Sequence, residues 1–195
     1  MLTDPCMRKA GNMTDGADDP IAVKLGHLFV ASDTDQDGFV DWSDYERLIS
    51  RYLDGYGVGE DDRRAHALRA AYQMYWSELL QQVNGVDRLS KEQFVVANQA
   101  AGVDGSRFTM AEVVPQAIFD VMDTDADDAI SKPEYKVFLE AWGVSDLEAL
   151  NVFLELDTDD DGRISRGEFI GAIREFFTSP ELESPASLFF GHIEH

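Results

Sequence analysis

Acidic residues recur at alternate positions in the segment Asp157–Glu168, which reads D-T-D-D-D-G-R-I-S-R-G-E. Three aspartates stand at positions 1, 3 and 5 of this segment, and a glutamate stands at position 12. Ca²⁺ prefers about 6–8 oxygen ligands at about 2.3–2.6 Å, and a tight turn can bring alternate carboxylates to such distances. Gly162 at position 6 gives the turn a positive φ without steric cost. The spacing therefore predicts direct chelation of Ca²⁺.

The segment matches the EF-hand calcium loop, D-x-[DN]-x-[DN]-G-x5-E, at every ligand position, and we call it loop IV. In such a loop the carbonyl at position 7 and the side chain at position 9 complete the ligand set. Two further segments follow the same plan, loop I (Asp33–Asp44) and loop III (Asp123–Glu134). The predicted metal ligands are Asp33, Asp35, Asp37, Phe39, Asp41 and Asp44 in loop I; Asp123, Asp125, Asp127, Ala129, Ser131 and Glu134 in loop III; and Asp157, Asp159, Asp161, Arg163, Ser165 and Glu168 in loop IV.

Two positions depart from the motif. Position 12 of loop I is Asp44 in place of glutamate. Because its side chain is one methylene shorter, we expect Asp44 to offer a single oxygen and to shift the site towards Mg²⁺, which prefers six oxygens at shorter distances. Position 6 of loop III is Asp128 in place of glycine. Aspartate tolerates the left-handed conformation better than most residues, so loop III is expected to bind with a mild penalty.

A fourth segment, loop II (Gln82–Gln93), has the length of an EF-hand loop but not its ligands. It carries Gln82, Val86 and Gln93 at positions 1, 5 and 12, so we expect no calcium binding. Position 8 is a branched apolar residue in all four loops: Val40, Leu89, Ile130 and Ile164. Since paired EF-hand loops meet through a short antiparallel bridge at this position, loop II is predicted to serve as the structural partner of loop I.

Apolar residues at helical spacing flank each loop, which predicts an all-α fold of four helix–loop–helix units in two pairs, joined by short β-bridges and packed into one globule. The expected organisation is a flexible tail over 1–20, a first pair over 21–101, a second pair over 102–178 and a tail over 179–195 that packs on the core. The first helix is expected to begin near Pro20, a favoured first-turn residue.

Composition narrows the classes of function. The net charge of −22 disfavours nucleic acid and anionic membranes as partners, and a hydrophobic fraction of 44% supplies a core. The single cysteine allows no intrachain disulfide, no apolar run approaches a membrane span, and the N-terminal segment lacks the apolar centre of a signal peptide. We therefore expect a cytoplasmic monomer. No Ser/His/Asp or Cys/His constellation indicates an enzyme.

The chain resembles calerythrin and the sarcoplasmic calcium-binding proteins. The features that carry this resemblance are four hands with a degenerate second loop, a long connector between the first two loops and an apolar C-terminal tail. The resemblance covers residues 21 to 195. It implies a compact protein that binds three Ca²⁺ ions and acts as an intracellular Ca²⁺/Mg²⁺ buffer or transporter, with Mg²⁺ competing above all at loop I.

Two other functions stay open from the sequence. A calcium sensor would expose an apolar groove to a target protein, often lined by methionine; here Met74, Met110 and Met122 are scattered among many aromatic residues. The calcium-triggered photoproteins also have active hands one, three and four around an apolar cavity, so a photoprotein-like or luciferin-binding-like carrier of an apolar ligand is the other alternative. In photoproteins the ligand site takes His, Trp and Tyr from the last helix and tail, whereas the matching segment Ile173–Thr178 has none of them.

Overall fold

Each acidic loop lies between two helices in the computed structural model, which describes residues 19–83, 86–102, 109–144 and 149–182. The helices are α1 (Pro20–Ser32), α2 (Trp42–Tyr56), α3 (Arg63–Gln82), α4 (Lys91–Gly102), α5 (Thr109–Met122), α6 (Lys132–Ala141), α7 (Ala149–Leu156) and α8 (Arg166–Thr178). Four two-residue strands accompany them: β1 (Val40–Asp41), β2 (Arg88–Leu89), β3 (Ala129–Ile130) and β4 (Ile164–Ser165). The predicted all-α class is confirmed. Residues 1–18 of the predicted N-terminal tail (1–20) and residues 183–195 of the predicted C-terminal tail (179–195) lie outside the described residues.

Helix starts follow from local capping. Asp19 accepts a hydrogen bond from the backbone N–H of Ile21 at 3.1 Å, and α1 begins at Pro20 as predicted. The helices that leave loops I, III and IV each begin with a capping box formed by positions 9 and 12 of the loop. The residues that could bind metal therefore also set the first turn of the exit helix, which couples loop geometry to helix direction.

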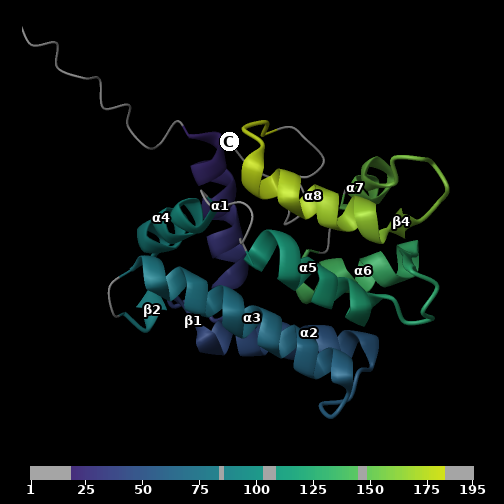
Figure 1. The fold of residues 1–195 in the computed structure, drawn as a ribbon, viewed down its shortest axis with the longest axis horizontal. Helices are drawn as coiled ribbons and strands as arrows, with labels where there is room; N and C mark the ends of the chain where they lie inside the picture. The colour runs from purple at the N-terminus through teal and green to yellow at the C-terminus, as the bar shows by residue number, and fades with distance from the viewer. Residues whose placement is uncertain (1–18, 84–85, 103–108, 145–148, 183–195) are drawn as a thin grey trace, which may run out of the picture.

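The loops pair through antiparallel strands with the predicted register. Val40 lies opposite Leu89, and Ile130 lies opposite Ile164. All four side chains are fully buried. In Figure 1 the β1–β2 pair and the β3–β4 pair lie towards opposite ends of the molecule. Loop II thus contributes a buried partner to loop I.

Truncating that partner tests the structural role of loop II. We expect Leu89→Ala to lower the free energy of unfolding by about 2–4 kcal/mol, because the side chain is fully buried. It should also weaken Ca²⁺ binding at loop I, although residue 89 offers no ligand. Urea unfolding and calcium titration measure both effects. Val96→Ala in the same hand is the control, since Val96 is 57% exposed; an unchanged loop I affinity in Leu89→Ala would contradict this role.

The two pairs of hands share one aromatic core. The ring of Tyr52 on α2 stacks on Phe138 of α6 with centroids 6.0 Å apart, and Phe138 also contacts Phe169 of α8 at 5.8 Å. The hydroxyl of Tyr56 donates to the carbonyl of Glu134 at 2.6 Å. Helix α5 contacts both α3 and α8 (Figure 1). Loops far apart in the sequence are therefore attached to a common interior.

A buried lysine ties the first helix to the last. The Nζ atom of Lys24 on α1 donates to the carbonyl of Ser179 at 2.6 Å and lies 5.5 Å from the ring centre of Phe176. Burial lowers the pKa of Lys24, while the nearby Glu175 and Glu181 oppose that shift.

Among the described helices, none is both long enough and apolar enough to cross a membrane.

Candidate metal centres

The structure gathers three carboxylates in each of loops I, III and IV. These are Asp33, Asp35 and Asp44; Asp123, Asp125 and Glu134; and Asp157, Asp159 and Glu168. In each group one oxygen from every residue lies within 4.8 Å of the others. Two ligands of one Ca²⁺ ion can be at most about 5 Å apart, since each Ca–O distance is about 2.3–2.6 Å. Positions 1, 3 and 12 therefore fit a single hard cation in each loop.

Position 1 organises the turn. In loop IV, Asp157 accepts hydrogen bonds from the N–H of Asp161 at 3.0 Å and of Gly162 at 2.8 Å. Asp33 and Asp123 accept the equivalent bonds from positions 5 and 6 of their loops. These bonds fold the chain around the first carboxylate, which places the next acidic side chains on the same side.

Positions 5, 7 and 9 of loops I, III and IV take part in the turn and in the cap of the exit helix. The aspartates at position 5 are Asp37, Asp127 and Asp161, and each accepts a hydrogen bond from the N–H of its own position 7, which is Phe39, Ala129 or Arg163. Position 9 is the N-cap of the exit helix in each loop, occupied by Asp41, Ser131 or Ser165. The structure thus brings positions 1, 3 and 12 within metal-binding distance and assigns turn and cap contacts to the others.

Position 12 connects the two ends of each loop. Glu168 accepts bonds at Oε1 from the N–H and hydroxyl of Thr158, at 2.8 and 2.6 Å, and at Oε2 from the N–H and hydroxyl of Ser165, at 2.8 and 2.7 Å. Burial tends to raise the pKa of Glu168, but these bonds outweigh it and lower the pKa to about 2. The same balance lowers the pKa of Glu134. Both carboxylates are therefore ionised near neutral pH.

Asp44 makes the equivalent threonine and backbone bonds despite its shorter side chain. Its Oδ1 accepts from the N–H and hydroxyl of Thr34, at 2.9 and 2.8 Å, and its Oδ2 accepts from the N–H of Asp41 at 2.9 Å. Burial opposes the shift, yet hydrogen bonds from Asp41, Thr34 and Arg47 lower the pKa of Asp44. Asp44 is 2% exposed. A buried, ionised carboxylate thus closes loop I as glutamate closes the other two.

The effect of this shortened residue on affinity is directly testable. We expect Asp44→Glu to raise the Ca²⁺ affinity of loop I about tenfold, because a second ligand oxygen becomes available. Calorimetric titration of chelator-treated protein measures the change. Glu46→Asp, which shortens an exposed acid on the same helix, is the control. Equal affinity of the Asp44→Glu and parent proteins would refute the idea that position 12 weakens this site.

The motif predicts only some of the residues that adopt a left-handed backbone conformation in the loops. Gly38 and Gly162 at position 6 have φ values of 85° and 87°, and Asp128 has 62°, in agreement with the prediction that aspartate takes this conformation. Position 4 is also left-handed in all three loops, at Gln36, Ala126 and Asp160. The motif leaves position 4 unspecified, so sequence reasoning missed this requirement.

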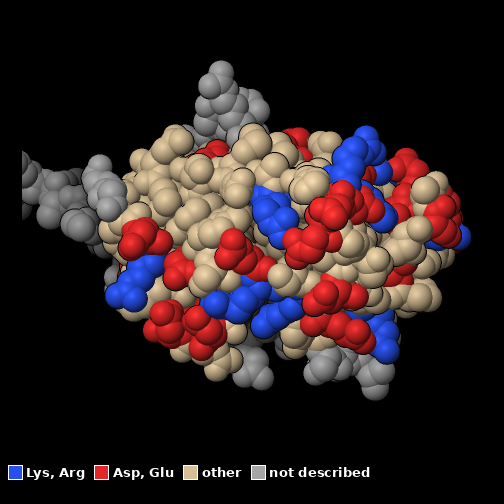
Figure 2. All heavy atoms as spheres, turned by 90° about the horizontal axis from the view of Figure 1, so that it is seen from below, with Lys and Arg blue, Asp and Glu red and all other residues tan. Residues whose placement is uncertain are grey.

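Sequence reasoning also missed the side-chain contacts that three arginines make with loop carboxylates. Arg163 of loop IV bonds to Asp127 of loop III, and Arg166 bridges Asp120 and Asp128 at 2.7 and 2.9 Å. In loop I, Arg47 contacts Asp35 and Asp44 at 2.7 and 2.6 Å. On the face drawn in Figure 2, basic side chains similarly lie beside acidic ones. These cations, which the net charge of −22 already counts, are thus placed where they neutralise individual loop carboxylates.

Loop II shows no comparable cluster. Within the described residues, which omit 84–85, no group of metal-ligating side chains forms there. Ser90 and Gln93 instead bond to each other, with the N–H of Ser90 donating to Oε1 of Gln93 at 3.0 Å. This contact repeats the link between positions 9 and 12 without a charge.

Comparisons with known proteins agree with this geometry. The EF hand family model matches residues 25–49 and 150–171, which include loops I and IV. The luciferin-binding protein of Renilla reniformis is 30% identical over 168 residues, covering 83% of this chain and 88% of that protein. Calerythrin of Saccharopolyspora erythraea is 24% identical, covering 78% and 89%. A calcium-binding protein of Streptomyces coelicolor has a similar structure, with a TM-score of 0.70, 29% identity and coverage of 81% and 98%.

Proposed function

Because this chain belongs to the EF-hand family of calcium-binding proteins, we propose that it acts as a Ca²⁺ buffer that binds one ion in each of loops I, III and IV. The observation that carries the proposal is the close grouping of positions 1, 3 and 12 in all three loops. Only oxygen donors are present in these groups, as Ca²⁺ and Mg²⁺ prefer. The ligands at positions 5, 7 and 9 complete each site in the proposal.

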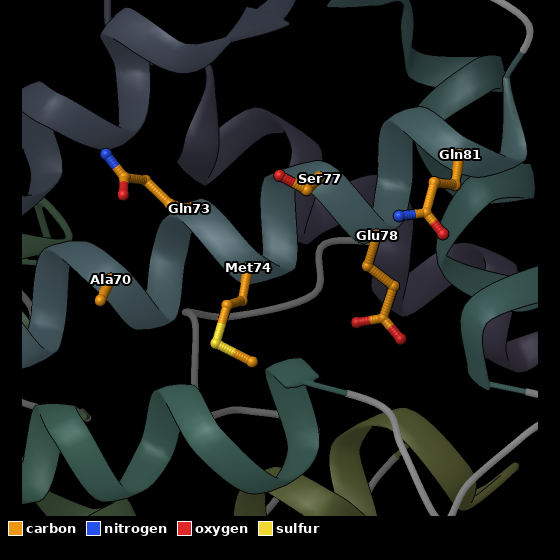
Figure 3. Close-up of a pocket in the computed structure, with 6 residues that line it drawn as sticks. All are labelled: Ala70, Gln73, Met74, Ser77, Glu78 and Gln81. Carbon is orange, nitrogen blue, oxygen red and sulfur yellow. The ribbon is translucent and has the colours of Figure 1, made fainter.

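The surface favours buffering over target recognition. The exposed large apolar residues of the described chain are Val30, Met74, Val96, Val113 and Leu154, and each comes from a different helix. A hollow along α3 is lined by Ala70, Gln73, Met74, Ser77, Glu78 and Gln81. Figure 3 shows that these six side chains belong to one helix and that Met74 is the only large apolar one. An amphipathic target helix needs a more continuous apolar groove.

A calorimetric Ca²⁺ titration of chelator-treated protein, without and with about 1 mM Mg²⁺, tests the buffer. We expect three sites with Kd near about 10⁻⁸ M, weakened by Mg²⁺, as buffer-type hands behave. Micromolar sites that are indifferent to Mg²⁺ would instead indicate a sensor. A count of fewer than three sites would show that at least one of loops I, III and IV binds no ion.

A second candidate function, carriage of a small aromatic ligand, is favoured by one feature of the core. Among the buried tyrosine hydroxyls of the described residues, that of Tyr135 has no hydrogen-bond partner, while that of Tyr45 lies beside Tyr75 and those of Tyr52 and Tyr72 lie beside each other. Leaving such a group unsatisfied costs about 1–3 kcal/mol, so a polar ligand atom could bind there. The relative from Renilla reniformis is a luciferin-binding protein.

Fluorescence titration with Renilla luciferin, with and without Ca²⁺, tests this second function. Saturable binding below about 100 μM that weakens in Tyr52→Phe or Tyr135→Phe would support it. A flat titration of the parent protein would exclude it, whatever the stability of the two phenylalanine variants.

A further inference from the structure

Loop I differs from loops III and IV in having an arginine on the carboxylates at positions 3 and 12. The Nη2 atom of Arg47 lies 2.7 Å from Oδ2 of Asp35 and 2.6 Å from Oδ1 of Asp44. One guanidinium nitrogen thus bridges positions 3 and 12, which are two of the three carboxylates grouped in this loop. A positive charge already offsets part of the negative charge on the oxygens that a divalent ion would need.

The position of this arginine follows from the helix. Arg47 stands three residues after Asp44 on α2, so the two side chains lie on the same helical face. Its Nε donates to the hydroxyl of Thr34 at 2.6 Å, and its Nη1 donates to the hydroxyl of Ser43 at 3.1 Å. With these four contacts the fork of donors is fixed against both ends of loop I.

The equivalent positions of the other two loops provide internal controls. Fourteen residues after the first ligand, loop III has Val137 and loop IV has Gly171, where loop I has Arg47. Neither residue carries a charge. Glu134 and Glu168 make the same threonine contacts that Asp44 makes. Arg163 does bond to Asp127 of loop III, but that carboxylate is at position 5, outside the group formed by positions 1, 3 and 12.

We propose that Arg47 is a tethered counter-cation that competes with the divalent ion for loop I and makes loop I the weakest of the three sites. Binding there requires the guanidinium to leave two ligand carboxylates, Asp35 and Asp44, whereas loop III has an arginine on one ligand carboxylate only, Asp127 at position 5, and loop IV has no comparable contact among its described residues. The inference rests on the proposed function, since it assigns a rank to one of the proposed sites. It gives the protein a site that fills only after the other two.

If the proposal holds, removing Arg47 lowers the stability of the metal-free protein but raises the Ca²⁺ affinity of loop I. Asp44 is 2% exposed, so a metal-free protein without the guanidinium has a buried carboxylate with less compensation. Its melting temperature in chelator should therefore fall. The same change frees two ligand carboxylates, so the Ca²⁺ affinity of loop I should rise, by roughly tenfold for one charge removed near the surface. A merely structural role for Arg47 would weaken both properties.

The experiment uses the full chain with Asp123→Ala and Asp157→Ala, so that loops III and IV lack their first ligand and loop I is measured alone. In this background, calorimetry with Ca²⁺ compares the chain that keeps Arg47 with Arg47→Gln and Arg51→Gln. Arg51 lies one turn further along α2 and contacts the carbonyl of Ala141 at 3.4 Å, so its replacement removes an equal charge without touching loop I. Arg47→Lys keeps the charge but not the planar fork.

We expect Arg47→Gln to bind about tenfold more tightly, Arg51→Gln to change less than about twofold and Arg47→Lys to lie between. Equal or weaker binding by Arg47→Gln overturns the proposal, as does a gain of the same size in Arg51→Gln. Absence of binding both in the chain that keeps Arg47 and in Arg47→Gln also overturns it. Failure of the buffer function is seen separately, as loss of the loop III and IV sites in the unaltered chain.

Discussion

Saturating Ca²⁺ is expected to raise the free energy of unfolding of this protein by up to about 12 kcal/mol. A ligand that binds only the folded state stabilises it by about 4 kcal/mol when its free concentration is about 1,000 times Kd, and three loops are proposed to bind. The metal-free protein also bears unusual repulsion, because the net charge is −22 and three carboxylates converge in each loop. The mutual repulsion is visible at loop IV, where Asp161 raises the pKa of Asp159.

Thermal and urea unfolding in Ca²⁺ and in chelator measure this effect. Ionic screening alone would also relieve repulsion between surface charges. The control is therefore KCl at the ionic strength of the calcium buffer, which should reproduce only a small part of the shift. A shift of equal size in KCl would mean that the loops bind no ion specifically, and it would remove the basis of the buffer proposal.

Local patterns predicted the parts of this fold that depend on neighbours in sequence. The register of Val40 with Leu89 followed from counting to position 8, and the start of α1 followed from Pro20. Asp128 was expected to accept a left-handed backbone, and it does. Each of these features is set within a single loop or helix turn, where residue type and spacing decide conformation.

The contacts between the hands could not be predicted in the same way. Arg163 and Asp127 are 36 residues apart, and the stacking of Tyr52 on Phe138 joins the first pair of hands to the second. Such contacts depend on how helices pack, which apolar periodicity does not specify. Arg47 is different, since its three-residue spacing from Asp44 was visible in the sequence. The loop motif ends at position 12, so it does not include a residue that lies one turn further along the exit helix.

Replacing Glu168 with glutamine is expected to abolish tight binding at loop IV, with a loss of about a thousandfold, or about 4 kcal/mol. Glutamine has nearly the same size but offers one uncharged oxygen where Ca²⁺ favours a bidentate carboxylate. The amide oxygen can still accept from Thr158. The amide nitrogen would then face the N–H of Ser165, which bonds to the second carboxylate oxygen at 2.8 Å. Two donors cannot satisfy each other, so the capping box of α8 is also lost.

Calorimetry should therefore count two tight sites in Glu168→Gln, where we expect three in the parent protein, and chelator-treated Glu168→Gln should lose about 1 kcal/mol of stability from the weakened cap. Glu175→Gln is the matched control, because it removes the same charge from an exposed position two turns along α8. Three tight sites in both variants would show that loop IV does not depend on position 12. Loss of all sites in Glu168→Gln alone would instead show that binding at loop IV is a condition for the other two, a coupling that the Arg163–Asp127 contact between loops IV and III would transmit.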